Sequence, residues 1–105
     1  MVTNRHAFTL SQQPHLARLE CWREPEFSDI AVLESLLREI PAGACVEVDL
    51  SRIAQLGGRG LGVFLMLRER NPTPHQRIRL VNSPRTLHKI LLAVGFDRMF
   101  EIGTP

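Results

Sequence analysis

A glycine-rich segment in the middle of the chain is the first place where residue types and spacing could do chemistry. The segment AQLGGRGLGVF (54–64) places four glycines and Arg59 within six positions. The backbone amides of such a segment can cradle a phosphate where it leads into a helix. Both familiar patterns are incomplete, however, because the last glycine of G-x-G-x-x-G would fall on Val63 and no Gly-Lys-Ser/Thr follows. The segment therefore predicts neither a dinucleotide site nor a P-loop.

The remaining reactive residue types form no catalytic or metal-binding pattern. Cys21 and Cys45 are not a CxxC pair, and none of the four histidines lies near another ligand at metal-site spacing. Glu47 and Asp49 alternate along one expected strand without a nearby histidine. Asp49 is expected to accept hydrogen bonds from the amides of the connector that follows it. We therefore expect no enzyme activity, no metal and no cofactor.

Composition predicts a single domain over residues 1–105, with its core at about 7–102. The chain is 44% hydrophobic and 23% charged, which excludes a disordered protein. A net charge of +2, without basic runs and with few aromatic residues, argues against nucleic-acid binding. The amino terminus lacks a secretory signal, and no apolar run approaches the roughly 18 residues of a membrane span. The expectation is a cytoplasmic protein without membrane insertion, its cysteines reduced and buried.

The elements that must position the glycines follow from apolar periodicity. Alternation over two residues predicts strands at 7–10, 15–22, 44–51, 77–82 and 99–102. The first two strands are joined by the short segment 11–14, which favours an antiparallel pair.

Helical spacing of apolar residues predicts helices at 27–41, 61–70 and 83–94. The second is apolar on nearly all sides and is expected to be mostly buried. In the third, Ser83 fits the N-cap, Pro84 the first helical position and Gly95 the left-handed residue after the end. The order β-β-α-β-α-β-α-β predicts an α/β domain with helices packed on a mostly parallel central sheet and an antiparallel first strand.

Motifs from Val46 onward occur in the order and spacing of a known family. Asp49–Ser51 is DLS, Gly60–Phe64 is GLGVF, Arg79–Asn82 is RLVN, and VGFDRMFEI closes the match. In these features the chain resembles the STAS domain family of anti-sigma-factor antagonists. The likeness covers a little over half of the chain, and the amino-terminal half agrees in element order alone. It implies a single STAS-like α/β domain that acts in signalling and transcription regulation through protein–protein contact.

The departure from the family pattern falls on the glycines. Alignment on Gly60–Gly62 places Gly57 where the family has aspartate, and Gly58 where it has the serine that a partner kinase phosphorylates. Glycine has no hydroxyl to esterify. The resemblance thus implies a degenerate phosphorylation site at the beginning of a helix.

Two functional hypotheses stay open at this point. The first is a phosphorylation-blind, non-enzymatic domain that binds an anti-sigma factor or an ATPase-type serine kinase; a homodimer also stays open. The second is a small-ligand or anion sensor, for example an accessory domain of a transport system, in which Arg59 closes over the amides of Gly57–Gly60. Trp22 either anchors an interface or covers the edge of the core. The predicted partner-binding surface comprises Ser51, Arg52, Gln55, Gly57, Gly58, Arg59 and Gly60.

Overall fold

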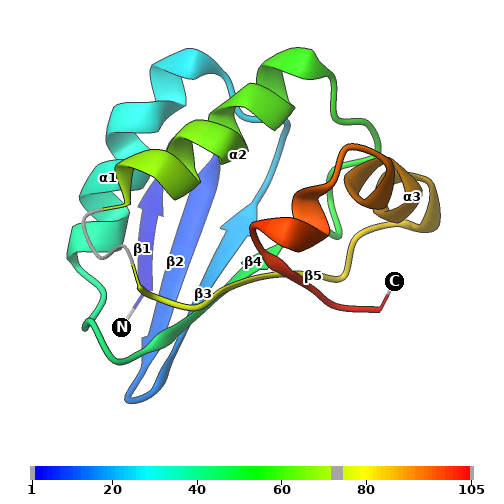
Figure 1. Cartoon of the computed structure of the whole chain (residues 1–105). Coiled ribbons are helices and arrows are strands. Elements are labelled where there is room, and N and C mark those ends of the chain that lie inside the picture. The colour runs from blue at the N-terminus through cyan, green and yellow to red at the C-terminus, as the bar shows by residue number, and fades with distance from the viewer. Residues whose placement is uncertain (1, 72–74, 105) are drawn as a thin grey trace.

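The computed structural model describes residues 2–71 and 75–104, which form a sheet with helices packed on it (Figure 1). The strands of this part of the chain are β1 (Val2–Arg5), β2 (Phe8–Gln13), β3 (Leu16–Cys21), β4 (Cys45–Asp49), β5 (Ile78–Val81) and β6 (Glu101–Ile102). Its α-helices are α1 (Ile30–Arg38), α2 (Gly58–Arg70) and α3 (Arg85–Ala93), and its 3₁₀ turns are η1 (Phe27–Asp29) and η2 (Phe96–Arg98).

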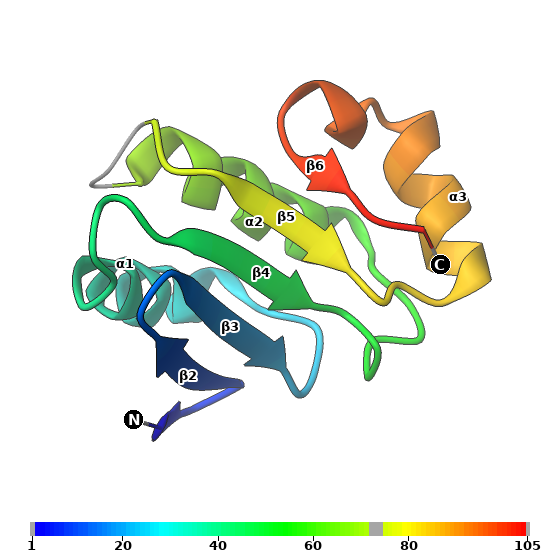
Figure 2. The same cartoon turned by 90° about the horizontal axis from the view of Figure 1, so that it is seen from below.

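The strand order of the sheet follows the chain, β1-β2-β3-β4-β5-β6. The pairs β1–β2 and β2–β3 are antiparallel, and all later pairs are parallel. Because each β-α-β connection advances by one strand in the same direction, right-handed crossovers place the helices on the same face. Seen from below, the opposite face of the sheet carries no helix (Figure 2). The predicted α/β fold with a mixed, mostly parallel sheet is confirmed.

The two faces of the sheet differ in residue type. On β4, Val46 and Val48 point to the helices and are fully buried, whereas Glu47 points to the uncovered face. There Glu47 accepts from Arg18 of β3 at 3.2 Å and from Arg79 of β5 at 3.3 Å. The three residues are register neighbours, so the open face neutralises its charges across strands.

The amino-terminal hairpins differ from the prediction. β1 was not expected, since its residues are mostly exposed and lack apolar alternation; pairing with β2, from Val2 opposite Ser11 to Arg5 opposite Phe8, creates it. The predicted connector 11–14 is also wrong, because β2 continues to Gln13 and pairs with Leu16 across a two-residue turn. Residues 11–13 are Ser, Gln and Gln, so this part of the strand has no apolar alternation that would predict it.

The structure corrects the expected beginning of α3 and confirms the left-handed residue expected after its end. The cap of α3 is Pro84 rather than Ser83, one residue later than predicted, and Ser83 is buried. After α3, Gly95 adopts the left-handed conformation with φ 81°, and its amide donates to the Leu92 carbonyl at 3.1 Å. Phe96, the next residue, is buried in the core.

Candidate functional site

The glycine-rich segment lies at the beginning of α2, at the edge where the parallel strands end. The helix begins at Gly58, three residues earlier than predicted, and extended Gly57 is its N-cap (φ −86°, ψ −175°). Gly58 and Gly60 are therefore helical rather than part of a loop before the helix, and Gly62 is helical as predicted. Of the predicted surface, the structure leaves exposed Ser51, Arg52, Gln55, Gly57, Gly58 and Arg59.

Gly60 is the exception among the predicted surface residues, because it is buried. A Cβ added there would lie 2.6 Å from Oε2 of Glu24 and 2.6 Å from Cδ1 of Leu56. Gly60 therefore contributes close packing under the surface and presents nothing to a partner. This corrects its expected place on the contact surface.

The connector between β4 and α2 is ordered by Asp49, in the role the sequence predicts. The Ser51 amide donates to Oδ1 of Asp49 at 2.9 Å. Burial of Asp49 opposes its ionisation, but hydrogen bonds from Ser51 and Asn82 and the nearby charge of Arg18 outweigh burial and hold the pKa of Asp49 below its usual range. Ile53 of this connector is buried in the core and anchors the backbone, which fixes the position of the exposed residues on either side of it.

A carboxylate that the sequence did not single out caps the site. Glu24, which follows β3, accepts a hydrogen bond on Oε2 from the Gly57 amide at 2.6 Å. The two residues are 33 positions apart. They meet because β3 and β4 are parallel neighbours, whose following segments emerge at the same edge. Topology could have predicted this meeting of segments, but no local pattern identifies Glu24 as the capping side chain.

The segment that contains Glu24 also places an aromatic ring on α2. Phe27 is 55% exposed, and a Cβ added to Gly62 would lie 3.4 Å from Cε1 of Phe27. Two glycines of α2 thus admit side chains from one neighbouring segment, Gly60 beneath Glu24 and Gly62 beneath Phe27. At Gly60 this packing leaves no room for a Cβ, whereas a Cβ at Gly62 would make a close but permitted contact and one at Gly58 would meet open space.

Asp29 holds that segment in shape. Its Oδ2 accepts from the Glu26 amide at 2.8 Å and from Arg23 at 3.0 Å, and its side chain is 2% exposed. Burial of Asp29 opposes ionisation, but the hydrogen bonds from Glu26 and Arg23 together with the positive charge of Arg23 outweigh it. The pKa of Asp29 is therefore lower than that of an ordinary aspartate.

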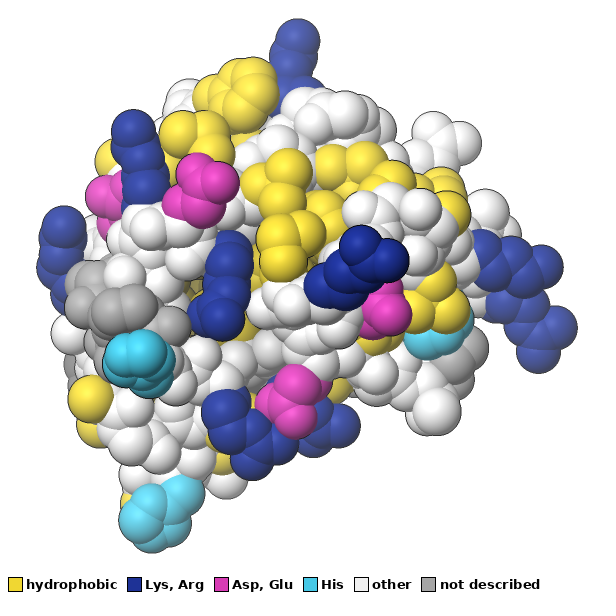
Figure 3. Space-filling view, viewed as in Figure 1, with side chains coloured by type: hydrophobic (Ala, Val, Ile, Leu, Met, Phe, Trp, Pro, Cys, Tyr) yellow, Lys and Arg dark blue, Asp and Glu magenta, His cyan; other side chains and the backbone are white. Residues whose placement is uncertain are grey.

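The outward face of α2 is apolar where a solvated helix would be polar. Leu65 is 37% exposed, and Leu61 and Met66 are half-buried. Figure 3 shows hydrophobic side chains gathered over α2, with arginine and lysine side chains around them. The expectation that this helix is mostly buried is therefore wrong on its outer side, because the helices of residues 2–71 and 75–104 cover a single face of this sheet and none of them is stacked above α2 (Figure 1). We call Phe27, Leu61, Leu65 and Met66 the apolar stripe.

Trp22 joins the same edge of the molecule. Cζ of Arg52 lies 4.2 Å from the centroid of the Trp22 ring, within cation–π distance. The indole Nε1 donates to Oγ1 of Thr9 at 2.7 Å, and Trp22 remains 44% exposed. The residue is therefore both tethered to the sheet and accessible, which fits an interface anchor.

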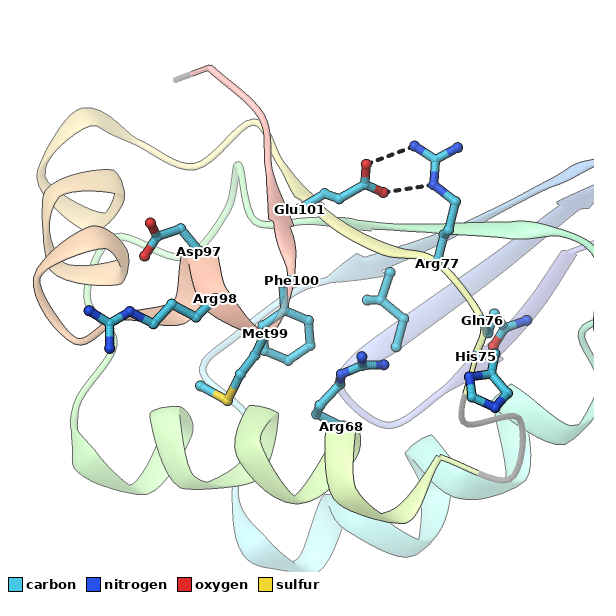
Figure 4. A pocket seen from close by; sticks show the side chains of 10 residues that line it. Arg68, His75, Gln76, Arg77, Asp97, Arg98, Met99, Phe100 and Glu101 are labelled. Atoms are coloured by element: carbon cyan, nitrogen blue, oxygen red, sulfur yellow. Dashed lines mark hydrogen bonds and ion pairs between the residues drawn. The ribbon is translucent and has the colours of Figure 1, made fainter.

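A hollow lies at the edge of the molecule away from the glycine-rich segment, by the end of α2 and the start of β5 (Figure 4). Its volume is about 330 Å³, and Arg68, Arg77, Arg98 and Glu101 are among its lining residues. Arg77 forms a two-pronged pair with Glu101, with Nε and Nη2 at 2.9 and 2.7 Å from the carboxylate oxygens. None of the predicted surface residues lines this hollow.

Metal binding and thiol chemistry find little support in the described residues. Within 2–71 and 75–104, no group of three or more His, Cys, Asp or Glu side chains could hold a metal ion. Burial, with smaller contributions from the charges of Asp49 and Asp29, raises the pKa of the Cys21 thiol to about 12. Cys21 therefore stays protonated at neutral pH and is a poor nucleophile. In the same described part, no helix has the length and apolarity needed to cross a membrane.

Comparison with known proteins assigns the family. The family model described as "Mlab, STAS domain" matches residues 9–102, and the chain belongs to the STAS domain family. No curated protein matches the chain in sequence. A protein of Thermotoga maritima described as an anti-sigma factor antagonist has a similar structure, with a TM-score of 0.72 at 15% identity, covering 95% of this chain and 88% of that chain. The anti-sigma factor antagonist SpoIIAA in its unphosphorylated form has a TM-score of 0.62 at 14% identity, covering 94% and 89%.

Proposed function

We propose that this STAS domain is a non-enzymatic regulatory module, which binds a protein partner through the amino end of α2 and is not phosphorylated there. The partner would be an anti-sigma factor, since two proteins of similar fold are described as anti-sigma factor antagonists, or an ATPase-type serine kinase, as the family resemblance implies. The role would lie in cytoplasmic signalling and transcription regulation.

One observation carries the proposal. Gly58 is the first residue of α2, it is exposed, and a Cβ placed on it would meet no atom within 4 Å. A serine would fit at this position without strain, so its absence is chemical rather than steric. Without a hydroxyl at position 58, no phosphate can bring its roughly −1.5 to −2 charge to the first residue of α2.

The surroundings of Gly58 favour contact with a protein. Arg52 and Arg59 are exposed on either side of it, and the apolar stripe continues along the outward face of the same helix. An interface of this kind combines an apolar centre with a charged rim. The partner is therefore expected to present apolar side chains flanked by acidic ones.

A kinase assay with a restored serine tests the phosphorylation part of the proposal. The purified protein and its Gly58→Ser variant are incubated with ATP and the serine kinase recovered with the chain from its native cytosol. Mass spectrometry should find phosphate at position 58 of the variant and no phosphate on the native chain. Stoichiometric phosphate on Ser51 of the native chain, an exposed hydroxyl of the predicted surface, would contradict the proposal.

The contact part is tested by titration calorimetry against the recovered partner. Gly58→Glu should weaken binding by roughly tenfold or more, since it adds a negative charge that opposes the acidic side chains expected on the partner. Gly43→Glu is the matched control, because Gly43 is also exposed with nothing within 4 Å of an added Cβ and lies in the turn before β4. Equal losses in both variants would place the contact elsewhere.

Anion sensing by the same segment is the second hypothesis. A hollow of about 480 Å³ beside Gly57 and Arg59 favours it. Against it, Glu24 and Glu26 line the hollow, and Glu24 already accepts from the Gly57 amide. Calorimetric titration with phosphate and nucleotides decides the matter: saturable binding that is lost in Arg59→Ala would establish the sensor.

A further inference from the structure

We propose that Glu24 is a positioning residue, whose carboxylate is the permanent anion of the amino end of α2 and holds residues 22–27 on the first two turns of that helix. The docking surface then consists of two chain segments, and its shape does not depend on modification. In calling this a docking surface, the inference rests on the proposed function.

The contacts at Gly57 and Gly60 carry the first step. Oε2 of Glu24 lies 2.6 Å from the Gly57 nitrogen and 2.6 Å from the place where a Gly60 Cβ would be. Cγ of Glu24 lies 2.8 Å from that same place. The whole end of the side chain therefore rests in space that opens because residue 60 has no side chain.

Charge carries the second step. The amino end of a helix has a partial positive charge, and a carboxylate that accepts from an amide there makes a charge-assisted hydrogen bond. Glu24 supplies this negative charge from within the chain. A second anion arriving at the same turn would be repelled by Glu24, so the segment suits a protein contact better than a phosphate.

The rigidity of the segment carries the third step. Three residues beyond Glu24, Phe27 lies across Gly62. The Asp29 carboxylate binds both Arg23, just before Glu24, and the Glu26 amide, just before Phe27. Fixing Glu24 therefore also fixes Phe27, which joins the apolar stripe. Two residues before Glu24, the guanidinium of Arg52 stacks over the Trp22 ring. Both ends of the segment 22–27, Trp22 and Phe27, therefore reach the proposed surface.

Amide hydrogen exchange, measured by NMR on the full chain, tests this arrangement without a partner. Glu24→Ala should speed exchange by roughly tenfold in both 22–27 and 57–61, because one charge-assisted hydrogen bond joins them. Glu24→Gln keeps an acceptor without the charge and should show a smaller increase in the same two segments. Glu69→Ala, which removes an exposed carboxylate from the other end of α2, should leave both unchanged.

A double-mutant cycle supplies the second arm. Gly60→Ala displaces the carboxylate and should reproduce the exchange pattern of Glu24→Ala, whereas Gly58→Ala, with open space at its Cβ, should not. In the double variant Glu24→Ala/Gly60→Ala, the fold increase in exchange rate should be smaller than the product of the fold increases in the two single variants, because both changes remove the same contact.

Three results would each overturn the inference. The exchange rates could be unchanged in Glu24→Ala, they could change in only one of the two segments, or the fold increases of the two single variants could multiply in the double variant. If Gly60→Ala fails to fold because of Leu56, the two Glu24 variants alone still decide. Since no partner enters these measurements, their failure leaves the proposed function standing, and failure of the kinase or calorimetry tests leaves the Glu24 contact standing.

Discussion

The uncovered face of the sheet and the amino end of α2 are both exposed and both carry charge, yet they are built differently. On the sheet, Glu47 lies between Arg18 and Arg79, and Arg77 is paired with Glu101. At the helix, Arg59 has no ion pair within the described residues, and apolar side chains lie beside it. A face whose charges are paired within the chain needs no partner protein to neutralise them. Unpaired charge next to exposed apolar side chains is instead typical of an interface.

The largest expected effect concerns the buried carboxylate behind the helix end. Asp29→Ala should lower the free energy of unfolding by about 2–3 kcal/mol, because it leaves the Glu26 amide without its acceptor and removes the partner of Arg23. Urea denaturation measures it. Glu47→Ala on the open face is the comparison, and a larger loss there than at Asp29 would reverse the assignment of the stronger network.

The apolar stripe should matter for binding and little for folding. Phe27→Ser should weaken binding of the recovered partner by roughly tenfold, because truncating an aromatic anchor in an interface commonly costs more than 1 kcal/mol. Leu92→Ser is the matched control, since Leu92 is similarly exposed on α3 at 45%. Calorimetry measures the affinity for the partner, and a thermal melt measures the stability of each variant. Equal affinities of Phe27→Ser and the native chain would show that the apolar stripe is not part of the interface.

Acid should weaken the helix end. The folded-state pKa of Asp29 and of Asp49 is lowered, so their contribution is fully present above the unfolded pKa of about 3.9. It is lost as the pH falls through the lower folded pKa values. As the pH falls below the unfolded pKa of about 3.9, the native chain should therefore lose more stability than Asp29→Asn, as followed by urea midpoints. Parallel curves would show that the Asp29 carboxylate is not coupled to folding.

The smallest effect is expected on the open face. Arg79→Ala should change the free energy of unfolding by less than about 1 kcal/mol, since Glu47 keeps Arg18 and the pairs are partly solvated. It should leave partner binding unchanged. A clear loss of affinity in this variant would mean that the partner also covers the sheet, and the contrast between the two regions would no longer hold.

Local patterns predicted most of the fold and part of the candidate site. The turn at Gly95 and the acceptor role of Asp49 follow from nearest neighbours in the chain, and the structure confirms both. Exposure of Gly57, Gly58 and Arg59 followed from the family likeness. β1 was missed because a polar edge strand has no periodicity of its own and exists through pairing with β2.

The sequence alone determined the order of strands and helices from β2 onward, the family, and the missing hydroxyl at position 58, since these depend on residue type and short-range spacing. Tertiary structure decided that Gly60 is buried, that Glu24 caps the helix 33 residues away, and that Leu65 faces outward. The physical reason is the same in each case. A residue's burial and its distant partners depend on which strands lie side by side and on which face of the sheet receives the helices, and no short stretch of chain encodes either.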